Sequence, residues 1–367
     1  MPPLTRARWL VVVGAAALVL AATMGAALFI GPAHLSLARA LDATLHPNFD
    51  REILLAVRLP RVLLGALTGA ALAAAGVAFQ GLLRNALADP YVLGVSGGAA
   101  LGGTAAIAAA AGLRALAAGG TIVGAALRAL GPAGTGAFLA GPYALPLAAF
   151  AGAALSILVV HRVALAARGG ALTILLVGAV FNAFAAAVIT FVKSIVAAEK
   201  AQELLYWLMG TLAAGAPPLA LGTAALLALT GIGALLLATP RLNWLALGPE
   251  AAAHLGVNVA RTETFVFLAA SLAVGATVAL TGLISFVGLI VPHGLRLWLG
   301  PDHRLLLPAA ALGGAAFLVA CDAATRALFL WLATEPPVGV VTAFAGGPFF
   351  LWLLRRGATR YRLDAAA

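Results

Sequence analysis

Residues 282–304 read GLISFVGLIVPHGLRLWLGPDHR. The first half is an apolar run like those that cross membranes, but the second half places Pro292, His293 and Arg296 where lipid-facing helices avoid such residues. His293 is therefore either a ligand for a molecule carried through a membrane or a residue at the end of a helix that meets water. The rest of the chain has to decide between these two interpretations.

The composition predicts an integral membrane protein. Of the 367 residues, 63% are hydrophobic and 9% are charged, which is more apolar material than a soluble fold can bury. The single cysteine, Cys321, excludes a disulfide framework and any metal centre built from several cysteines. The formal net charge is +10, but the arginines are scattered in ones and twos between apolar runs, so we expect no nucleic-acid partner.

Ten apolar runs of about 17 to 23 residues are bounded by Pro, Gly or charged residues. Because lipid offers no water to a free backbone, these runs must be helices, and the predicted fold is an all-α integral membrane protein with about ten transmembrane helices in one domain, residues 1–367. The basic, apolar start resembles a signal peptide, but its length predicts a retained first helix. The predicted spans are 9–31, 60–82, 93–111, 146–164, 171–192, 218–238, 264–281, 283–299, 305–321 and 338–354.

The distribution of basic residues predicts that both termini are cytoplasmic. With both ends on one side, the loops on that side hold 13 of the 22 Lys and Arg residues, against nine on the other side. Arg39, Arg51, Arg58 and Arg61 precede the second span and run against this rule, and docking of an acidic partner is one explanation. The Gly-rich segment 112–145 is either a periplasmic insertion with a short helix or an extension of the third span.

The chain has no motif for hydrolysing ATP. A phosphate-binding loop requires G-x-x-x-x-G-K-[ST], and neither lysine, Lys193 or Lys200, follows a glycine. No His-x-x-x-His or paired-carboxylate arrangement lies inside a predicted span, so metalloprotease and carboxylate-dyad chemistry lack their residues. We therefore predict a protein that is not itself an enzyme.

A long polar loop, 239–262, is predicted on the cytoplasmic side. It contains a run of small residues, Glu250–Gly256, that is either a helix inserting into a groove on a soluble partner or an ordinary surface helix. The residues alone do not decide between the two.

Polar residues around the second span also have two interpretations. Asn85, Asp89 and Pro90 predict a tight inside turn that ends one helix and caps the next. Arg58 and Arg61 are three residues apart, so they share a helical face if the second span begins early. There they either meet a partner or extend along the helix toward water.

Several motifs together resemble the FecCD family, the permease subunits of type II ATP-binding-cassette importers that carry iron–siderophore complexes, haem and cobalamin into bacteria. They follow the family order over most of the chain. The motifs are RLPR, GAALAAAGVAFQGLLRNALADPYVLGVSGGAALG, LLYWLMGTL, LALGPEAAAHLGV, the run from GLISFVGLIVPHG to CDAATR, and EPPVGVVTAFAGGPFFLWLL.

This resemblance implies the type II importer permease fold and a set of partners. The partners are a second copy forming a homodimer around a central pathway, a cytoplasmic ATP-binding-cassette ATPase dimer and a periplasmic substrate-binding protein. The implied location is the bacterial cytoplasmic (inner) membrane, with membrane lipid around the spans. ATP and Mg would be bound by the ATPase, with no cofactor or metal in this chain.

The family pattern also implies residue roles. The residues expected to couple to the ATPase are Glu250, Ala251, Ala252, His254, Leu255 and Gly256. Those expected at an exposed periplasmic rim, docking the binding protein, are Arg58, Arg61 and Arg326. Those expected at the cytoplasmic gate or along the pathway are Asn85, Ala171, Leu172 and Asn182.

The opening question receives an answer from the resemblance. Because the family motif includes Pro-His whatever the cargo, Pro292 is expected to remove a backbone donor and bend the helix, and His293 and Arg296 to face the cytoplasmic interface. His34 and His46, in an outside loop, are better placed to touch a haem, but loop histidines without partners are more often solvated.

Two other classes of function have weaker support. An ion-coupled secondary transporter usually needs an ionisable relay at mid-membrane, whereas the acids here, Asp89, Asp302, Asp322 and Glu335, lie at span ends. A membrane scaffold would leave the basic outer rim and the coupling loop unexplained. The motifs do not choose among iron–siderophore, haem and cobalamin, and a slight preference for iron chelates rests only on their abundance in the family.

Overall fold

The computed structural model describes residues 4–42, 44, 47–118, 144–167, 171–212 and 217–364. Within these ranges the regular structure is helical, with no strand. Seven helices are long and apolar enough to cross a membrane, and shorter apolar helical stretches, Val95–Ala109, Val287–Leu299 and Val338–Leu351, occupy the other predicted spans. The ten predicted spans are thus confirmed as helices. They are α1 (Arg6–Phe29), α4 (Leu59–Leu82), α5 (Val95–Ala118), α8 (Ala144–Ala166), α9 (Ala171–Ile195), α11 (Pro218–Leu245), α13 (Val259–Thr281), α14 (Val287–Leu299), α15 (His303–Leu332) and α16 (Val338–Asp364).

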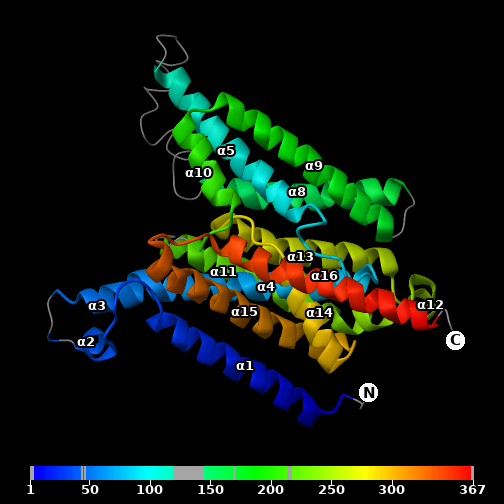
Figure 1. Ribbon diagram of the computed structural model, residues 1–367. Helices are drawn as coiled ribbons and strands as arrows, with labels where there is room; N and C mark the ends of the chain where they lie inside the picture. Colours follow the sequence, from blue (N-terminus) through cyan, green and yellow to red (C-terminus); the bar gives the residue numbers. More distant parts are fainter. Residues whose placement is uncertain are drawn as a thin grey trace.

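Short helices lie at the two ends of this bundle. One end carries both termini and α12 (Pro249–His254), and the opposite end carries α2 (Leu37–Leu41) and α3 (Phe49–Glu52) (Figure 1). Helix α10 (Ala198–Leu208) follows α9. The shared end of the termini and α12 agrees with the predicted placement of loop 239–262 on the same side as both termini.

Helix α4 is the centre of the bundle. It packs against α11, α13, α14 and α15, while α5, α8, α9 and α10 form a separate layer above it in Figure 1. Glycines make the close approach possible: a Cβ added to Gly69 would overlap the carbonyl of Gly314, and one added to Gly76 would overlap the carbonyl of Gly288. Small residues on α4 therefore set the spacing of the core.

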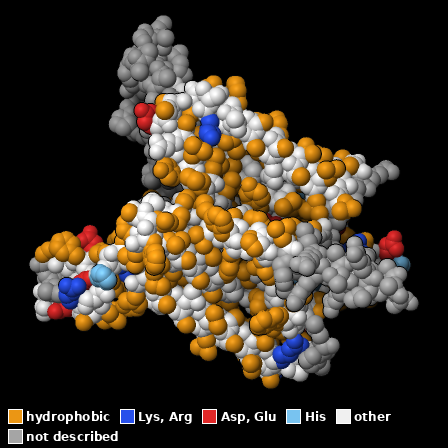
Figure 2. Space-filling view, in the orientation of Figure 1, with side chains coloured by type: hydrophobic (Ala, Val, Ile, Leu, Met, Phe, Trp, Pro, Cys, Tyr) orange, Lys and Arg blue, Asp and Glu red, His pale blue; other side chains and the backbone are white. Residues whose placement is uncertain are grey.

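The outer surface is that of a membrane protein. Hydrophobic side chains cover the middle of the visible face, whereas charged groups gather toward its two ends (Figure 2). Exposed apolar side chains such as Leu18 of α1 and Leu237 of α11 are placed where lipid would surround them.

Helix boundaries differ from the prediction in three places. The second span begins early, because α3, the π-helical turn Ile53–Arg58 and α4 form one continuous helix from Phe49 to Leu82. Helix α14 begins only at Val287, because Gly282 and Phe286 both have φ of 69°, outside the right-handed helical region. In the uncertain segment 112–145, α5 continues to Ala118, and residues 119–143 lie outside the described residues.

Candidate functional site

Two helix interruptions meet inside the bundle. Residues 83–94 separate α4 from α5, and residues 282–286 separate α13 from α14. A Cβ added to Gly288 would lie 2.8 Å from the Leu72 carbonyl oxygen and 3.1 Å from Oδ2 of Asp89. Leu72 is ten residues before the end of α4, about 15 Å along its axis, so the chain after α4 folds back into the bundle. Irregular backbone at such depth occurs in membrane proteins where protein buries it or where it lines a cavity.

Pro292 explains one contact between these interruptions. Because it has no N–H, the carbonyl of Gly288 cannot receive the usual bond from four residues later. The buried side-chain amide of Gln80 on α4 lies 3.4 Å from that carbonyl and 3.4 Å from the next one, of Leu289. Pro292 thus leaves a carbonyl of α14 available to the Gln80 amide, and this contact links α14 to α4.

The predicted turn that ends α4 is confirmed, but Asp89 and Pro90 do not cap the next helix, because α5 begins only at Val95. Asn85 Oδ1 accepts a hydrogen bond from the Leu87 amide at 2.9 Å, and Asp89 Oδ1 accepts one from the Tyr91 amide at 2.7 Å. Asp89 is buried, and its Oδ2 has no hydrogen-bond partner among the described residues. Its position beside Gly288 corrects the expectation that Asp89 lies at a span end, which followed from its place in the sequence alone.

Asn182 of α9 holds the returning chain. Its Nδ2 donates to the carbonyls of Tyr91 at 2.9 Å and Val92 at 3.3 Å. The side chain expected to line a pathway therefore bonds inside the subunit. Leu172, expected at the gate, is 78% exposed, while the side chain of Ala171 lies outside the described part.

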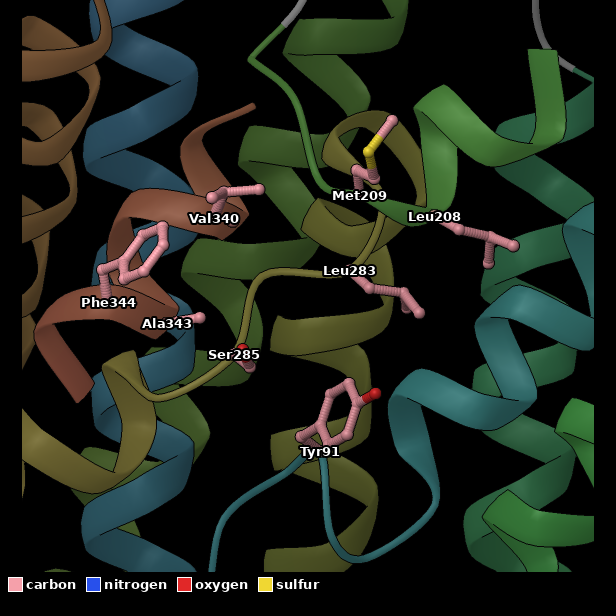
Figure 3. A pocket seen from close by; sticks show the side chains of 9 residues that line it. Tyr91, Leu208, Met209, Leu283, Ser285, Val340, Ala343 and Phe344 are labelled. Carbon is pink, nitrogen blue, oxygen red and sulfur yellow. The ribbon is translucent and has the colours of Figure 1, made fainter. Parts of the chain in front are cut away.

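A cavity of about 430 Å³ lies where these segments meet the start of α16. Figure 3 shows Tyr91 from the returning loop, Ser285 from the α13–α14 interruption and Phe344 from α16 around it. Apart from these two hydroxyl groups, the side chains that line the cavity are apolar. They offer a solute no charged group to bind, which suits passage more than retention. Sequence reasoning missed this cavity, although Gly282, the first residue of the opening stretch, was a signal for an interruption.

The arginines expected at an exposed rim are mostly buried, which corrects that expectation. Arg58 is 5% exposed and donates to the carbonyls of Leu28 and Ala33. Arg326 is 3% exposed, and its Nη1 bonds the carbonyls of Ala27 and Ile30. The C-terminal end of α1 carries carbonyls without helical partners and a partial negative charge, so it attracts the guanidinium groups.

Two of the three arginines, Arg61 and Arg326, also pair with carboxylates. Asp322, which is 1% exposed, accepts from Arg61 Nε at 2.9 Å and from Arg326 Nε at 3.1 Å. Glu335 accepts from Arg61 Nη1 at 2.8 Å. Arg58 and Arg61 do lie on one helix that begins early, as predicted, but their partners belong to this chain.

The short run expected to couple to an ATPase is a helix, α12, closed at both ends by glycines. Gly248 has φ of 117° and Gly256 has φ of 84°, values that favour glycine. Glu250, His254 and Leu255 are exposed, whereas Ala252 is buried. Ala252 therefore packs α12 against its own chain, and Ala251 is half-buried. The role of these residues in coupling to an ATPase stays a prediction.

The histidines form no recognisable centre. Among the described residues, no group of three or more His, Cys, Asp or Glu side chains is arranged to hold a metal ion. His293 is half-buried beside Arg296, His34 is exposed, and His46 lies outside the described residues.

Ten apolar helices, interrupted helices beside an open cavity and an exposed short helix at one end define a multi-pass membrane protein built for transport. The chain belongs to the FecCD transport family, whose model matches residues 17–356. The cobalamin import system permease protein BtuC of Halobacterium salinarum is 40% identical over 84% of this chain and 75% of its own. The hemin transport system permease protein HmuU of Yersinia pestis is 37% identical over 83% and 84%. A solved metal-chelate type ABC transporter in an inward-facing conformation matches 94% of this chain and 98% of its own, with a TM-score of 0.76 and 28% identity.

Proposed function

We propose that this chain is the permease subunit of an ATP-binding-cassette importer that moves a metal chelate from the periplasm to the cytoplasm. The observation that carries the proposal is membership of the FecCD family over residues 17–356, in a fold whose interrupted helices lie beside a cavity. Three relatives match over more than four fifths of this chain. They are the permeases named for cobalamin and hemin import and the Fe(3+)-citrate import permease YfmD of Bacillus subtilis. The cargo is therefore a metal chelate of one of these classes.

The energy source in this proposal is a separate ATPase dimer at the end that carries α12. Support comes from the exposed Glu250, His254 and Leu255 and from a chain that lacks the phosphate-binding loop motif. Closure of the ATPase dimer would move α12 and change which side of the pathway is open. ATP and Mg belong to that partner.

The second partner is another copy of this chain. One face of α9 presents a stripe of exposed apolar side chains, which are Leu172, Leu176, Val180, Phe184, Phe191 and Ile195. Phe344 of α16, which borders the cavity, is exposed as well. A copy packed on these surfaces would form the second wall of a pathway that includes the cavity.

The third partner is a substrate-binding protein at the end that carries α2 and α3, and the membrane is the bacterial inner membrane with both termini cytoplasmic. Because Arg58 and Arg326 are buried and bonded within this chain, they are not the groups that would bind the partner at that end. Arg61 and the partly exposed Glu335 lie nearest to solvent in the arginine cluster and are the first groups a docking partner would meet.

The experiment is reconstitution of the purified protein with its ATPase subunit in proteoliposomes. ATP hydrolysis and uptake are measured with the binding protein loaded in turn with ferric siderophore, haem or cobalamin. Stimulation and uptake with one loaded form would support the importer and identify its cargo. Absence of any assembly with an ATPase, in protein shown to be folded, would overturn the proposal.

The same vesicles test the ion-coupled alternative. Asp89, buried beside Gly288, is the one observation that favours it, because an acid at membrane depth is a feature of ion-coupled transporters. Uptake that persists without the ATPase but collapses with a proton uncoupler would favour that mechanism.

A further inference from the structure

A polar cluster joins the last turn of α11 to the first turn of α15. Asn243 Nδ2 donates to Asp302 Oδ1 at 2.8 Å. Asn243 Oδ1 accepts from the backbone N–H of His303 at 2.8 Å and lies 2.7 Å from His303 Nδ1. Because the amide oxygen already faces a backbone donor, the orientation of the amide is fixed, and His303 Nδ1 must carry a proton to bond it.

Asp302 places this cluster at a helix terminus. It is the N-cap of α15, where Oδ1 accepts from the Arg304 amide at 3.0 Å and Oδ2 pairs with Arg304 Nη2 at 2.8 Å. Asn243 thus bonds both the capping side chain and the first backbone amide of α15. An asparagine is suited to this position because its side chain donates and accepts at once.

His303 extends the contact to α4. Its ring is buried, and its Nε2 has no partner among the described residues. A Cβ added to Gly81, in the last turn of α4, would overlap this nitrogen. The histidine therefore packs directly against the backbone that leads into residues 83–94, the loop held by Asn182 of α9.

The same loop also approaches α12. A Cβ added to Gly248, the residue before α12, would lie 3.6 Å from Nη1 of Arg84. Asn243 lies six residues before Pro249, where α12 begins. Residues 83–94 are thus close to the residue that precedes α12, and a second route through Asn243 and His303 connects the chain before α12 to the end of α4.

We propose that Asn243 is a positioning residue that transmits the movement of α12 to α4 and the loop 83–94, through Asp302 and His303. This inference rests on the proposed function, since α12 moves only if an ATPase drives it. Without the Asn243 bonds, α11 and α12 would shift while α15 and α4 remain in place. ATP would then be hydrolysed without opening the pathway.

Spatial continuity alone does not establish energetic coupling, so the test compares two activities of one complex. Asn243→Asp keeps the acceptor for His303 but replaces the donor to Asp302 with a second carboxylate. In proteoliposomes holding the complete complex and a loaded binding protein, chelate uptake is expected to fall roughly tenfold while ATP hydrolysis changes much less. The ATP consumed per chelate transported therefore rises.

Two further variants separate positioning from general support of the fold. Adding Asp302→Asn to Asn243→Asp restores a donor–acceptor pair, because the amide introduced at position 302 can donate to the carboxylate introduced at position 243. This double variant is expected to return the ratio toward that of the unaltered protein. The control is Asn258→Asp, the N-cap of α13 beyond the other end of α12, where aspartate caps as well as asparagine. Its ratio is expected to stay unchanged.

The outcomes are distinct. The inference would be overturned if Asn243→Asp left the ATP consumed per chelate transported unchanged. It would also be overturned if uptake and hydrolysis fell in proportion and did not recover in the double variant. Either result would leave the proposed function standing. If the Asn243→Asp complex does not assemble, the ATP consumed per chelate transported is measured with Asn243→Ala, which removes the same bonds without adding a charge. Failure of the unaltered complex to transport any of the three chelates would count against the proposed function instead.

Discussion

The side-chain amide of Gln80 on α4 lies 3.4 Å from the carbonyl of Gly288 on α14, the carbonyl that Pro292 leaves without its helical donor. This contact predicts that Gln80 and Pro292 act together on stability. Gln80→Leu should lower the free energy of unfolding by about 1–3 kcal/mol, because it leaves a buried carbonyl unsatisfied. In a Pro292→Ala background the new N–H can bond Gly288, so the same Gln80→Leu change should cost clearly less.

The measurement is thermal unfolding in detergent, followed by a thiol-reactive dye at the buried Cys321. Additive effects of the two substitutions would show that Gln80 and Pro292 do not act on the same carbonyl.

The features that could be predicted from the sequence are those that lipid and local residue chemistry determine. Ten helices followed from apolar run lengths, and the Asn85 turn followed from residue types. The beginning of α14 was predicted too early, because Phe286 adopts a positive φ that is uncommon for a phenylalanine and cannot be read from the sequence. The arginines were expected in solvent because their partners are remote in the sequence: Arg61 and Asp322 are 261 residues apart. Pairings of that kind depend on helix packing, which hydrophobic patterns do not specify.

The arginine cluster predicts unequal effects of its two carboxylates. Asp322→Asn leaves the buried Arg326 without a carboxylate and Arg61 with only Glu335. Removing one partner of a buried pair costs roughly 3–5 kcal/mol. Glu335→Gln removes a carboxylate that is 31% exposed and should cost about 0–1 kcal/mol. Melting temperatures of the two variants in one detergent check this, and equal losses would contradict the separation of buried from exposed groups.

Asp302 predicts a dependence of stability on pH. The Arg304 side chain, followed by Asn243 and the Arg304 amide, lowers the pKa of Asp302 from 3.8 to about 2. Because the folded-state pKa is depressed, the stabilisation is present above pH 3.8 and is lost as pH falls toward 2. The melting temperature of the unaltered protein should therefore fall more between about pH 5 and about pH 3 than that of Asp302→Asn. Parallel curves for the two proteins would contradict this.

The exposed stripe on α9 predicts contact with a second copy. In a Cys321→Ala background, single cysteines at Leu176, Val180 or Phe184 should include at least one that cross-links to its own counterpart in native membranes. A cysteine at Leu18 on α1, exposed to a similar extent, is the matched control and should not cross-link. Cross-linking that is absent from the stripe, or equal at Leu18, would assign this face to lipid.

Gly256 offers a test of α12 that separates backbone strain from contact with a partner. Its φ of 84° penalises any side chain, but no heavy atom of another described residue, beyond its chain neighbours, lies within 4 Å of an added Cβ. Gly256→Ala and Gly256→Trp therefore share the backbone cost of about 1–2 kcal/mol, and only tryptophan projects bulk beyond the surface. We expect the alanine variant to retain the ATPase subunit on co-purification and the tryptophan variant to bind it more weakly by about tenfold or more. Equal loss in both variants would attribute the effect to the turn itself, and full binding by both would place the ATPase contact elsewhere on this end of the protein.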